Sequence, residues 1–147
     1  MSIQEDKSRE LFANGFNCAQ AVLGAFCEGD GLDMETAMKL STGFGGGARC
    51  GEICGAVSGA IMVIGLKYGV YGDKLLERNT QCRAMSYEFI KAFKEAHNFI
   101  ICRELLGVDI RTPEDHNSAQ AMESYRKVCP ELVASAVRIL ENMAAGG

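Results

Sequence analysis

The chain has 147 residues and a formal net charge of −4, and it contains no basic run interleaved with aromatic residues, which disfavours nucleic-acid binding. Hydrophobic residues make up 48% of the chain and charged residues 23%, as in an ordinary globular protein. The longest apolar run, residues 53–66, is shorter than the roughly 20 residues that a bilayer span needs, and no segment of signal-peptide type opens the chain. We therefore expect a cytoplasmic protein with no membrane span and no nucleic-acid partner.

Apolar residues recur with helical rather than strand periodicity, and the chain contains only two prolines. Asn17, Asp33 and Thr112 are predicted helix caps, and Gly69 is a predicted helix end. The predicted helices cover residues 3–13, 18–27, 34–41, 53–68, 73–96, 102–106, 113–127 and 130–143. Since no linker or internal repeat interrupts them, we expect an all-α fold. Residues 1–147 are predicted to form a single-domain multi-helix bundle, with a glycine-rich loop before a buried central helix.

The glycine-rich segment, residues 43–51, directly precedes the central helix. Successive backbone N–H groups in such a segment can bind an anion, but no Gly-Lys-Ser/Thr follows and no strand precedes it, so nucleotide-binding motifs are not supported. We interpret it as a tight backbone path that brings Cys54 against a partner or cofactor, with simple turn geometry as the alternative. The candidate cofactor-binding residues are Gly45, Gly46, Gly47 and Gly55.

Seven cysteines, an odd number, point to metal or redox chemistry rather than to a structural disulfide framework in a chain long enough to bury a core. Four of them, Cys18, Cys54, Cys102 and Cys129, lie at or just before a predicted helix start. A helix N-terminus presents unpaired N–H groups and about half a positive charge, which favours a thiolate. We therefore predict lowered thiol pKa values for these four and take them as candidate catalytic residues and metal ligands. Their long spacings, with no C-x-x-C pair, mean that only the fold can assemble a shared site.

The remaining cysteines and the histidines are weaker candidates. Cys27 and Cys82 are interpreted as small buried hydrophobic residues. Cys50 is intermediate, since it could form a strained disulfide with the cysteine four residues later or resolve its oxidised form. His97 and His116 are predicted surface or helix-end residues without a second ligand at helical spacing.

One segment carries a family resemblance. Residues 51–66 contain Cys54-Gly55-Ala56-Val57-Ser58-Gly59, which resembles the CGAxxG motif of the bacterial and archaeal C-GCAxxG-C-C family, whose members are described as redox-active. The similarity extends to Cys18 after Asn17, to Cys102 before Arg103 and to Cys129 before Pro130. It implies that the four family cysteines are Cys18, Cys54, Cys102 and Cys129. The family is also similar to part of the split-Soret type of cytochrome, which suggests iron–sulfur ligation, although this chain has no motif for covalent haem.

Three hypotheses follow. In the first, the four cysteines ligate an iron–sulfur cluster or another thiolate-bound metal and transfer electrons. In the second they cycle between thiols and disulfides, and in the third they serve a sensor or binding module without catalysis. Whether the protein is an oxidoreductase stays open among these. The partners to test are a redox partner protein and a second copy of the chain in a homodimer.

Overall fold

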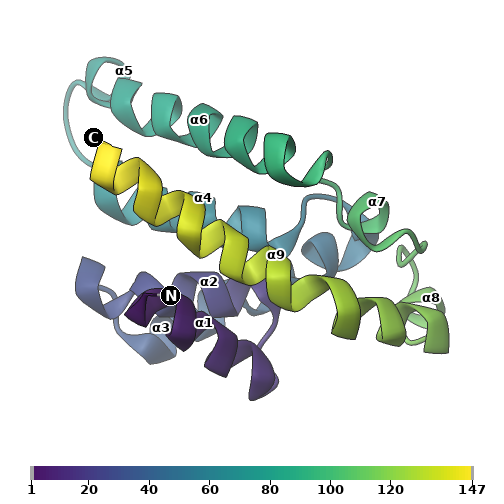
Figure 1. The fold of residues 1–147 in the computed structure, drawn as a ribbon. Helices are drawn as coiled ribbons and strands as arrows, with labels where there is room; N and C mark the ends of the chain where they lie inside the picture. The colour runs from purple at the N-terminus through teal and green to yellow at the C-terminus, as the bar shows by residue number, and fades with distance from the viewer. Residues whose placement is uncertain (1, 147) are drawn as a thin grey trace.

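The computed structural model describes the backbone of residues 2–146 and the side chains of residues 2–144. The described residues form an all-α structure, which confirms the predicted fold class (Figure 1). The helices are α1 Ile3–Ala13, α2 Cys18–Phe26, α3 Met34–Ser41, α4 Gly55–Tyr68, α5 Leu75–Arg78, α6 Thr80–His97, α7 Cys102–Leu106, α8 Pro113–His116 and α9 Ala119–Gly146. Short helical turns span Glu28–Asp30, Thr42–Phe44 and Gly47–Gly51. Within the same residues, no helix is both long enough and apolar enough to cross a membrane.

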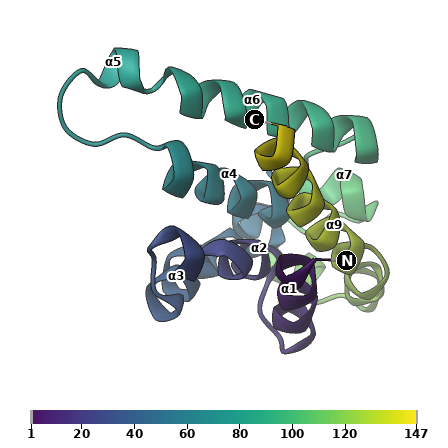
Figure 2. The same ribbon diagram turned by 60° about the vertical axis from the view of Figure 1, so that its left-hand side comes forward.

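The helices stack in layers around α2 and α4. Helix α2 packs against α1, α3, α4 and α9, while α4 also contacts α6 and α9. Figures 1 and 2 show α6 on one side of α4 and the N-terminal helices α1–α3 on the other. Figure 2 also shows the α4–α5 connection extending away from the other helices. The main core lies between these layers and includes the fully buried residues Val22, Leu23, Val57, Val63, Phe89, Phe93 and Val133.

Small residues allow α2 and α4 to approach each other closely. A Cβ atom placed on Gly59 would lie 2.7 Å from the carbonyl oxygen of Ala19, and one on Gly55 would lie 3.0 Å from the Ala19 backbone nitrogen. Contacts this short with a backbone leave no room for a side chain at Gly59. The glycine repeat on the central helix therefore marks its contact with α2.

The three predicted capping residues each begin a helix. The side chain of Asn17 accepts a hydrogen bond from the Gln20 N–H, and the Gln20 side chain accepts one from the Asn17 N–H, so a complete capping box starts α2. Asp33 caps α3 and Thr112 caps α8 in the predicted way. The capping box fixes where Cys18, the first residue of α2, lies on the helix.

Two predicted helix boundaries in the C-terminal half are wrong. The helix predicted over residues 113–127 breaks after His116, and α9 then runs without interruption from Ala119 past Pro130. Proline has no N–H and is costly inside a helix, but the residues after it bury a continuous apolar face against the core, and this packing keeps the helix intact. Cys129 therefore lies in the middle of a helix and not at its start.

The helix predicted over residues 73–96 is also divided. It forms the short α5 and the longer α6, with Lys74 in a left-handed conformation before α5 and Asn79 between the two helices.

Candidate functional site

A short antiparallel bridge holds Cys54 beside Cys102. Ile53 pairs with Ile101 in this bridge. The backbone N–H of Cys54 donates to the opposite segment at 2.8 Å, and that of Cys102 donates back at 2.6 Å. Side chains alternate between the two faces of paired extended segments, so Cys54 and Cys102 share the face opposite the two isoleucines. The bridge therefore places two of the four candidate cysteines next to each other.

The other two candidate cysteines meet where α2 packs against α9. The Cys18 thiol at the start of α2 faces the sulfur of Cys129 on α9, and hydrogen bonding between the two thiols is the main influence on both of their pKa values. The charges of Cys54 and Cys102 also act on Cys18, which shows that the second pair lies close by. The fold thus brings together four cysteines from four separate segments, and we call them the four-cysteine cluster.

Most of this cluster is shielded from solvent. Cys54 is 3% exposed, Cys129 is 4% exposed and Cys102 is 6% exposed. Cys18 is partly exposed. Hydrogen bonding with Cys129 and then burial nonetheless raise the pKa of its thiol, so the partial exposure belongs to the residue as a whole and not to a freely accessible sulfur.

Burial decides the acidity of the Cys54 and Cys102 thiols. It raises the pKa of Cys54 to about 11, and the backbone N–H groups of Ala56 and Val57 only partly oppose the rise. Burial, together with the charges of Cys54 and Cys129, raises the pKa of Cys102 to about 12. The prediction that helix starts lower these pKa values is wrong, because the cost of burying a thiolate exceeds the stabilisation by the helix N-terminus.

The Cys18–Cys129 pair behaves differently because the two thiols act on each other more strongly than any other neighbour does. Hydrogen bonding with Cys18 lowers the pKa of Cys129, although Cys129 lies within a helix and gains nothing from a helix start. The same interaction, together with burial, raises the pKa of Cys18 well above its ordinary value. The lowered pKa predicted for Cys129 is thus present, but a neighbouring thiol causes it, and the lowered pKa predicted for Cys18 is wrong.

Two of the candidate glycines lie directly against the cysteine-bearing segments. A Cβ on Gly47 would lie 2.5 Å from the Glu52 nitrogen and 2.8 Å from the Cys102 Cβ, and its φ of +63° favours glycine as well. A Cβ on Gly55 would lie 3.2 Å from the Cys18 Cβ. Both glycines let the segment before α4 lie against the cluster.

The other two candidate glycines contact residues beside the cluster. A Cβ on Gly45 would lie 2.6 Å from the Asn17 Cβ, and one on Gly46 would lie 3.2 Å from Nε2 of His116. The chain continues in the left-handed conformation through Ala48 and Arg49, which is strained for residues with side chains. All four glycines thus have protein atoms as neighbours, and cofactor binding by them stays a prediction.

A pocket of about 250 Å³ opens beside Cys18 and Cys129. It is smaller than common ligand pockets, which measure about 300–1,000 Å³. Its lining side chains include Phe12, Phe16, Cys18, Arg49, His116, Tyr125 and Cys129. A larger cavity of about 550 Å³ lies elsewhere, beside Phe26 and Lys67, and no cysteine lines it. The smaller pocket is the one that gives access to the cluster.

Tyr125 belongs to this site although the sequence reasoning missed it. It packs against the small apolar cluster that contains Cys102 and Cys129, and its hydroxyl oxygen is buried. Burial, followed by the charges of nearby cysteines, raises its pKa strongly. Tyr125 lies four residues before Cys129, so both side chains are on one face of a continuous helix. That spacing could have identified it, but the predicted helix boundary between the two residues concealed it.

All seven cysteines are free of disulfides. Cys27 is fully buried in the main core, as predicted. Cys82 is only partly buried, and Cys50 is exposed, with its Sγ 3.4 Å from the Gly47 carbonyl oxygen. His97 ends α6, in the predicted place, with Nε2 2.7 Å from Oγ of Ser135.

The four thiols supply the soft donors that iron–sulfur clusters and zinc prefer. In the described residues, however, no group of three or more His, Cys, Asp or Glu side chains is arranged to hold a metal ion. The donor chemistry and the partnerless Tyr125 hydroxyl beside it are the two features that fit a thiolate-bound group.

The fold and the cluster together define an all-α protein with four converging cysteines. Residues 16–143 match the family model described as "Putative redox-active protein (C_GCAxxG_C_C)", and the chain belongs to this family, which confirms the resemblance seen in the sequence. Comparison with curated proteins finds no match, and comparison with solved structures finds none either.

Proposed function

We propose that the four-cysteine cluster is the redox centre of this protein, with Cys18, Cys54, Cys102 and Cys129 as thiolate ligands of an iron–sulfur cluster or another thiolate-bound metal. The observation that carries the proposal is the convergence of these four cysteines from four separate segments. The bound group would supply one-electron transfer, and the chain would hold it away from water.

The pairing of the cysteines favours a two-iron cluster among the thiolate-bound groups. Four thiolates hold a [2Fe–2S] cluster, two on each iron. Cys18 and Cys129 form one pair, and Cys54 and Cys102, held by the bridge, form the other. Positive N-terminal helix charge at α2 offsets part of the negative charge that such a cluster carries.

Ligation would require the buried thiols to lose their protons. The pKa values of Cys54 and Cys102 are raised by burial, so both are protonated at neutral pH in the absence of a metal. Binding would therefore release protons and become tighter as the pH rises.

The chemistry of free thiols also suggests the cellular compartment and the partners of this protein. We infer that residues 1–147 act as one redox domain in the cytoplasm, where reducing conditions keep cysteines available as thiols. Its electrons would pass to or from a redox partner protein, and a homodimer is a further arrangement to test.

A second function, thiol–disulfide exchange, is favoured by one specific observation. The Cys18 and Cys129 thiols are neighbours that act on each other's pKa, and Cys18 as a residue is partly exposed. Loss of two protons and two electrons from this pair would form an S–S bond, and the electrons would reduce a disulfide of a partner protein.

The test is to reconstitute the protein anaerobically with ferrous iron and sulfide. Iron, acid-labile sulfide and the visible absorption spectrum are then measured. We expect bound iron and sulfide in the wild type and a marked loss in Cys18→Ser, Cys54→Ser, Cys102→Ser and Cys129→Ser. The matched control is Cys82→Ser on α6, which should retain the wild-type content.

A wild-type protein that takes up no iron and no sulfide would contradict the cluster function. In that case, peptide mapping after mild oxidation examines the second function. A Cys18–Cys129 disulfide supports exchange chemistry, whereas four cysteines that stay reduced exclude it.

A further inference from the structure

The hydroxyl of Tyr125 is a buried polar group without a partner. Its oxygen is shielded from solvent, and none of the described residues accepts or donates a hydrogen bond to it. Burying a hydroxyl without a hydrogen bond costs about 1–3 kcal/mol, so natural proteins rarely retain such a group without a reason. A phenylalanine would fill the same space without this cost.

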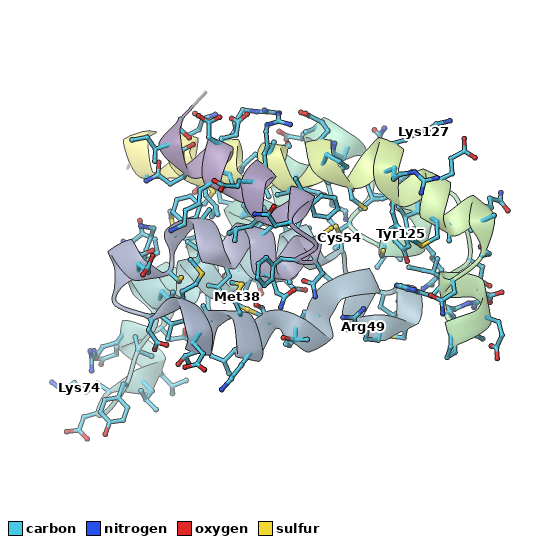
Figure 3. All side chains as sticks on the ribbon, turned by 90° about the horizontal axis from the view of Figure 1, so that it is seen from below. Met38, Arg49, Cys54, Lys74, Tyr125 and Lys127 are labelled. Atoms are coloured by element: carbon cyan, nitrogen blue, oxygen red, sulfur yellow. The ribbon has the colours of Figure 1, made fainter. Side chains whose placement is uncertain are left out.

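The surroundings of the ring show where a partner could come from. Tyr125 packs against the small apolar cluster that contains Cys102 and Cys129, and it lines the pocket that Cys18 and Cys129 also line. The ring of His116 lies 5.2 Å away at an interplanar angle of 48°, which is an aromatic contact with no hydrogen bond to the hydroxyl. Figure 3 shows Tyr125 and Cys54 in one part of the molecule and Lys74 far from both. The sulfurs of the cluster lie in the same part of the molecule as the hydroxyl and are acceptors of the right chemistry for it.

A tyrosine hydroxyl is a donor, and a thiolate sulfur is an acceptor. A tyrosine hydroxyl keeps its proton at neutral pH, since the ordinary pKa of tyrosine is about 10. A protonated hydroxyl beside ionised sulfurs can donate a hydrogen bond, and such charge-assisted bonds are stronger than those between neutral groups.

We propose that Tyr125 is a positioning residue whose hydroxyl donates a hydrogen bond to a sulfur of the four-cysteine centre and thereby sets its reduction potential. The inference rests on the proposed redox function of the cluster and assigns a residue outside the cysteine motif to it. A hydrogen bond to sulfur stabilises the more negative, reduced state, so Tyr125 raises the reduction potential.

The experiment compares Tyr125→Phe with Tyr87→Phe, which removes the same hydroxyl from an exposed tyrosine on α6. The first readout is an anaerobic redox titration of the iron- and sulfide-loaded protein. We expect Tyr125→Phe to lower the reduction potential, and the reduced state to lose about tenfold in relative population at a given potential. Tyr87→Phe should titrate as the wild type does.

The second readout is urea unfolding of the metal-free protein. Tyr125→Phe should be at least as stable as the wild type, because it removes a hydroxyl that has no partner without the centre. A clear loss of stability in the metal-free variant, with an unchanged potential in the loaded one, would show a purely structural role and overturn the inference.

The measurements on the wild type test cluster ligation independently of the role of Tyr125. If the wild type binds no iron and no sulfide, cluster ligation fails before any variant is compared. The Cys18–Cys129 couple is then equilibrated with glutathione buffers, where Tyr125→Phe should shift the thiol–disulfide equilibrium about tenfold towards the disulfide. If the equilibrium of Tyr125→Phe equals that of the wild type, the inference is wrong.

Discussion

At the scale of single residues, burial and the helix N-terminus have opposite effects on the pKa of a thiol. Cys54 immediately precedes α4 and receives help from two backbone N–H groups, yet burial raises its pKa to about 11. A helix N-terminus contributes about 0.3–1 kcal/mol at an exposed position, whereas desolvation of a buried charge shifts a pKa by up to several units. Position on a helix therefore predicts thiol acidity only where the sulfur remains in water.

This competition predicts how the cysteines react in the reduced, metal-free protein. Cys50 is exposed and should be alkylated first at neutral pH. Cys54 and Cys102, with pKa values of about 11 and 12 and little exposure, should react last. Their rates should rise about tenfold for each pH unit between pH 7 and 10, because the thiolate fraction does so below the pKa. The measurement is a pH series of alkylation, followed residue by residue by mass spectrometry.

The Cys18–Cys129 pair provides the internal comparison in that series. The pKa of Cys129 is lowered by its thiol neighbour, so Cys129 should react at lower pH than Cys54 and Cys102. Loading with iron and sulfide should protect all four cysteines and leave Cys50 reactive. Rapid alkylation of Cys54 and Cys102 at pH 7 would show that they are neither buried nor poorly acidic.

At the scale of the helices, the continuity of α9 decides which side chains face the cluster. Pro130 leaves the carbonyl four residues before it without its usual helical partner, and sequence rules place a helix boundary there. The apolar face that follows, which includes Leu132, Val133 and Val137, is buried and holds the helix in register through the proline. Because the helix continues, Cys129 and Tyr125 lie on one face.

The contact between α2 and α4 gives a prediction at the same scale. Gly59→Ala places a Cβ 2.7 Å from a backbone oxygen of α2, so it should lower the free energy of unfolding by about 1–3 kcal/mol. Gly65→Ala changes the same helix at a place with no atom within 4 Å, so it should raise stability by about 0.5–1 kcal/mol. Urea unfolding of the two variants measures both effects, and equal effects of the same sign would refute the close packing of these helices.

At the scale of the whole molecule, an ion-pair network joins the first helix to the last. Glu5 on α1 is 1% exposed. Its carboxylate accepts hydrogen bonds from Arg138 at 3.0 Å and from Arg9 at 3.3 Å, and Arg138 also pairs with Glu131. Since a buried carboxylate needs partners, the network ties α1 to α9 beside the core.

Removing the Arg138 side chain tests whether the ion-pair network between α1 and α9 stabilises the protein. Arg138→Ala should lower the free energy of unfolding by about 1–2 kcal/mol, because it weakens the pairing of a buried carboxylate. Lys127→Ala removes an exposed partner of Glu123 on the same helix and should change stability by less than about 0.5 kcal/mol. Urea unfolding distinguishes the two, and an Arg138→Ala variant as stable as Lys127→Ala would show that the network contributes little.

The pH dependence of the stability of Arg138→Ala follows from the loss of its ion pair with Glu131. Its hydrogen bond with Arg138 lowers the pKa of Glu131 from the ordinary value of 4.5. A carboxyl whose pKa is lowered by folding adds stability above its unfolded pKa, and this contribution is lost as the pH falls through the folded pKa. Arg138→Ala should therefore lose less stability than the wild type on acidification below about pH 4.5. The effect is small because Glu131 is largely exposed.

Local chemistry in the sequence determined most helix starts and the four family cysteines. The caps Asn17 and Asp33 act within a few residues of themselves, so their effect is independent of the rest of the fold. The apolar periodicity was likewise sufficient to predict an all-α protein. The motif around Cys54 and its spaced companion cysteines led to the family that the comparison then confirmed.

Only the tertiary structure decided the properties that depend on contacts between distant segments. The bridge beside Cys54, the thiol contact between Cys18 and Cys129, and the place of Tyr125 all join residues that are far apart in the chain or separated by a predicted boundary. Burial is likewise a property of the packed molecule, and it reversed the acidity expected for Cys54 and Cys102. Local sequence sets where a helix can begin, but the free energy of packing an apolar face decided that α9 runs through Pro130.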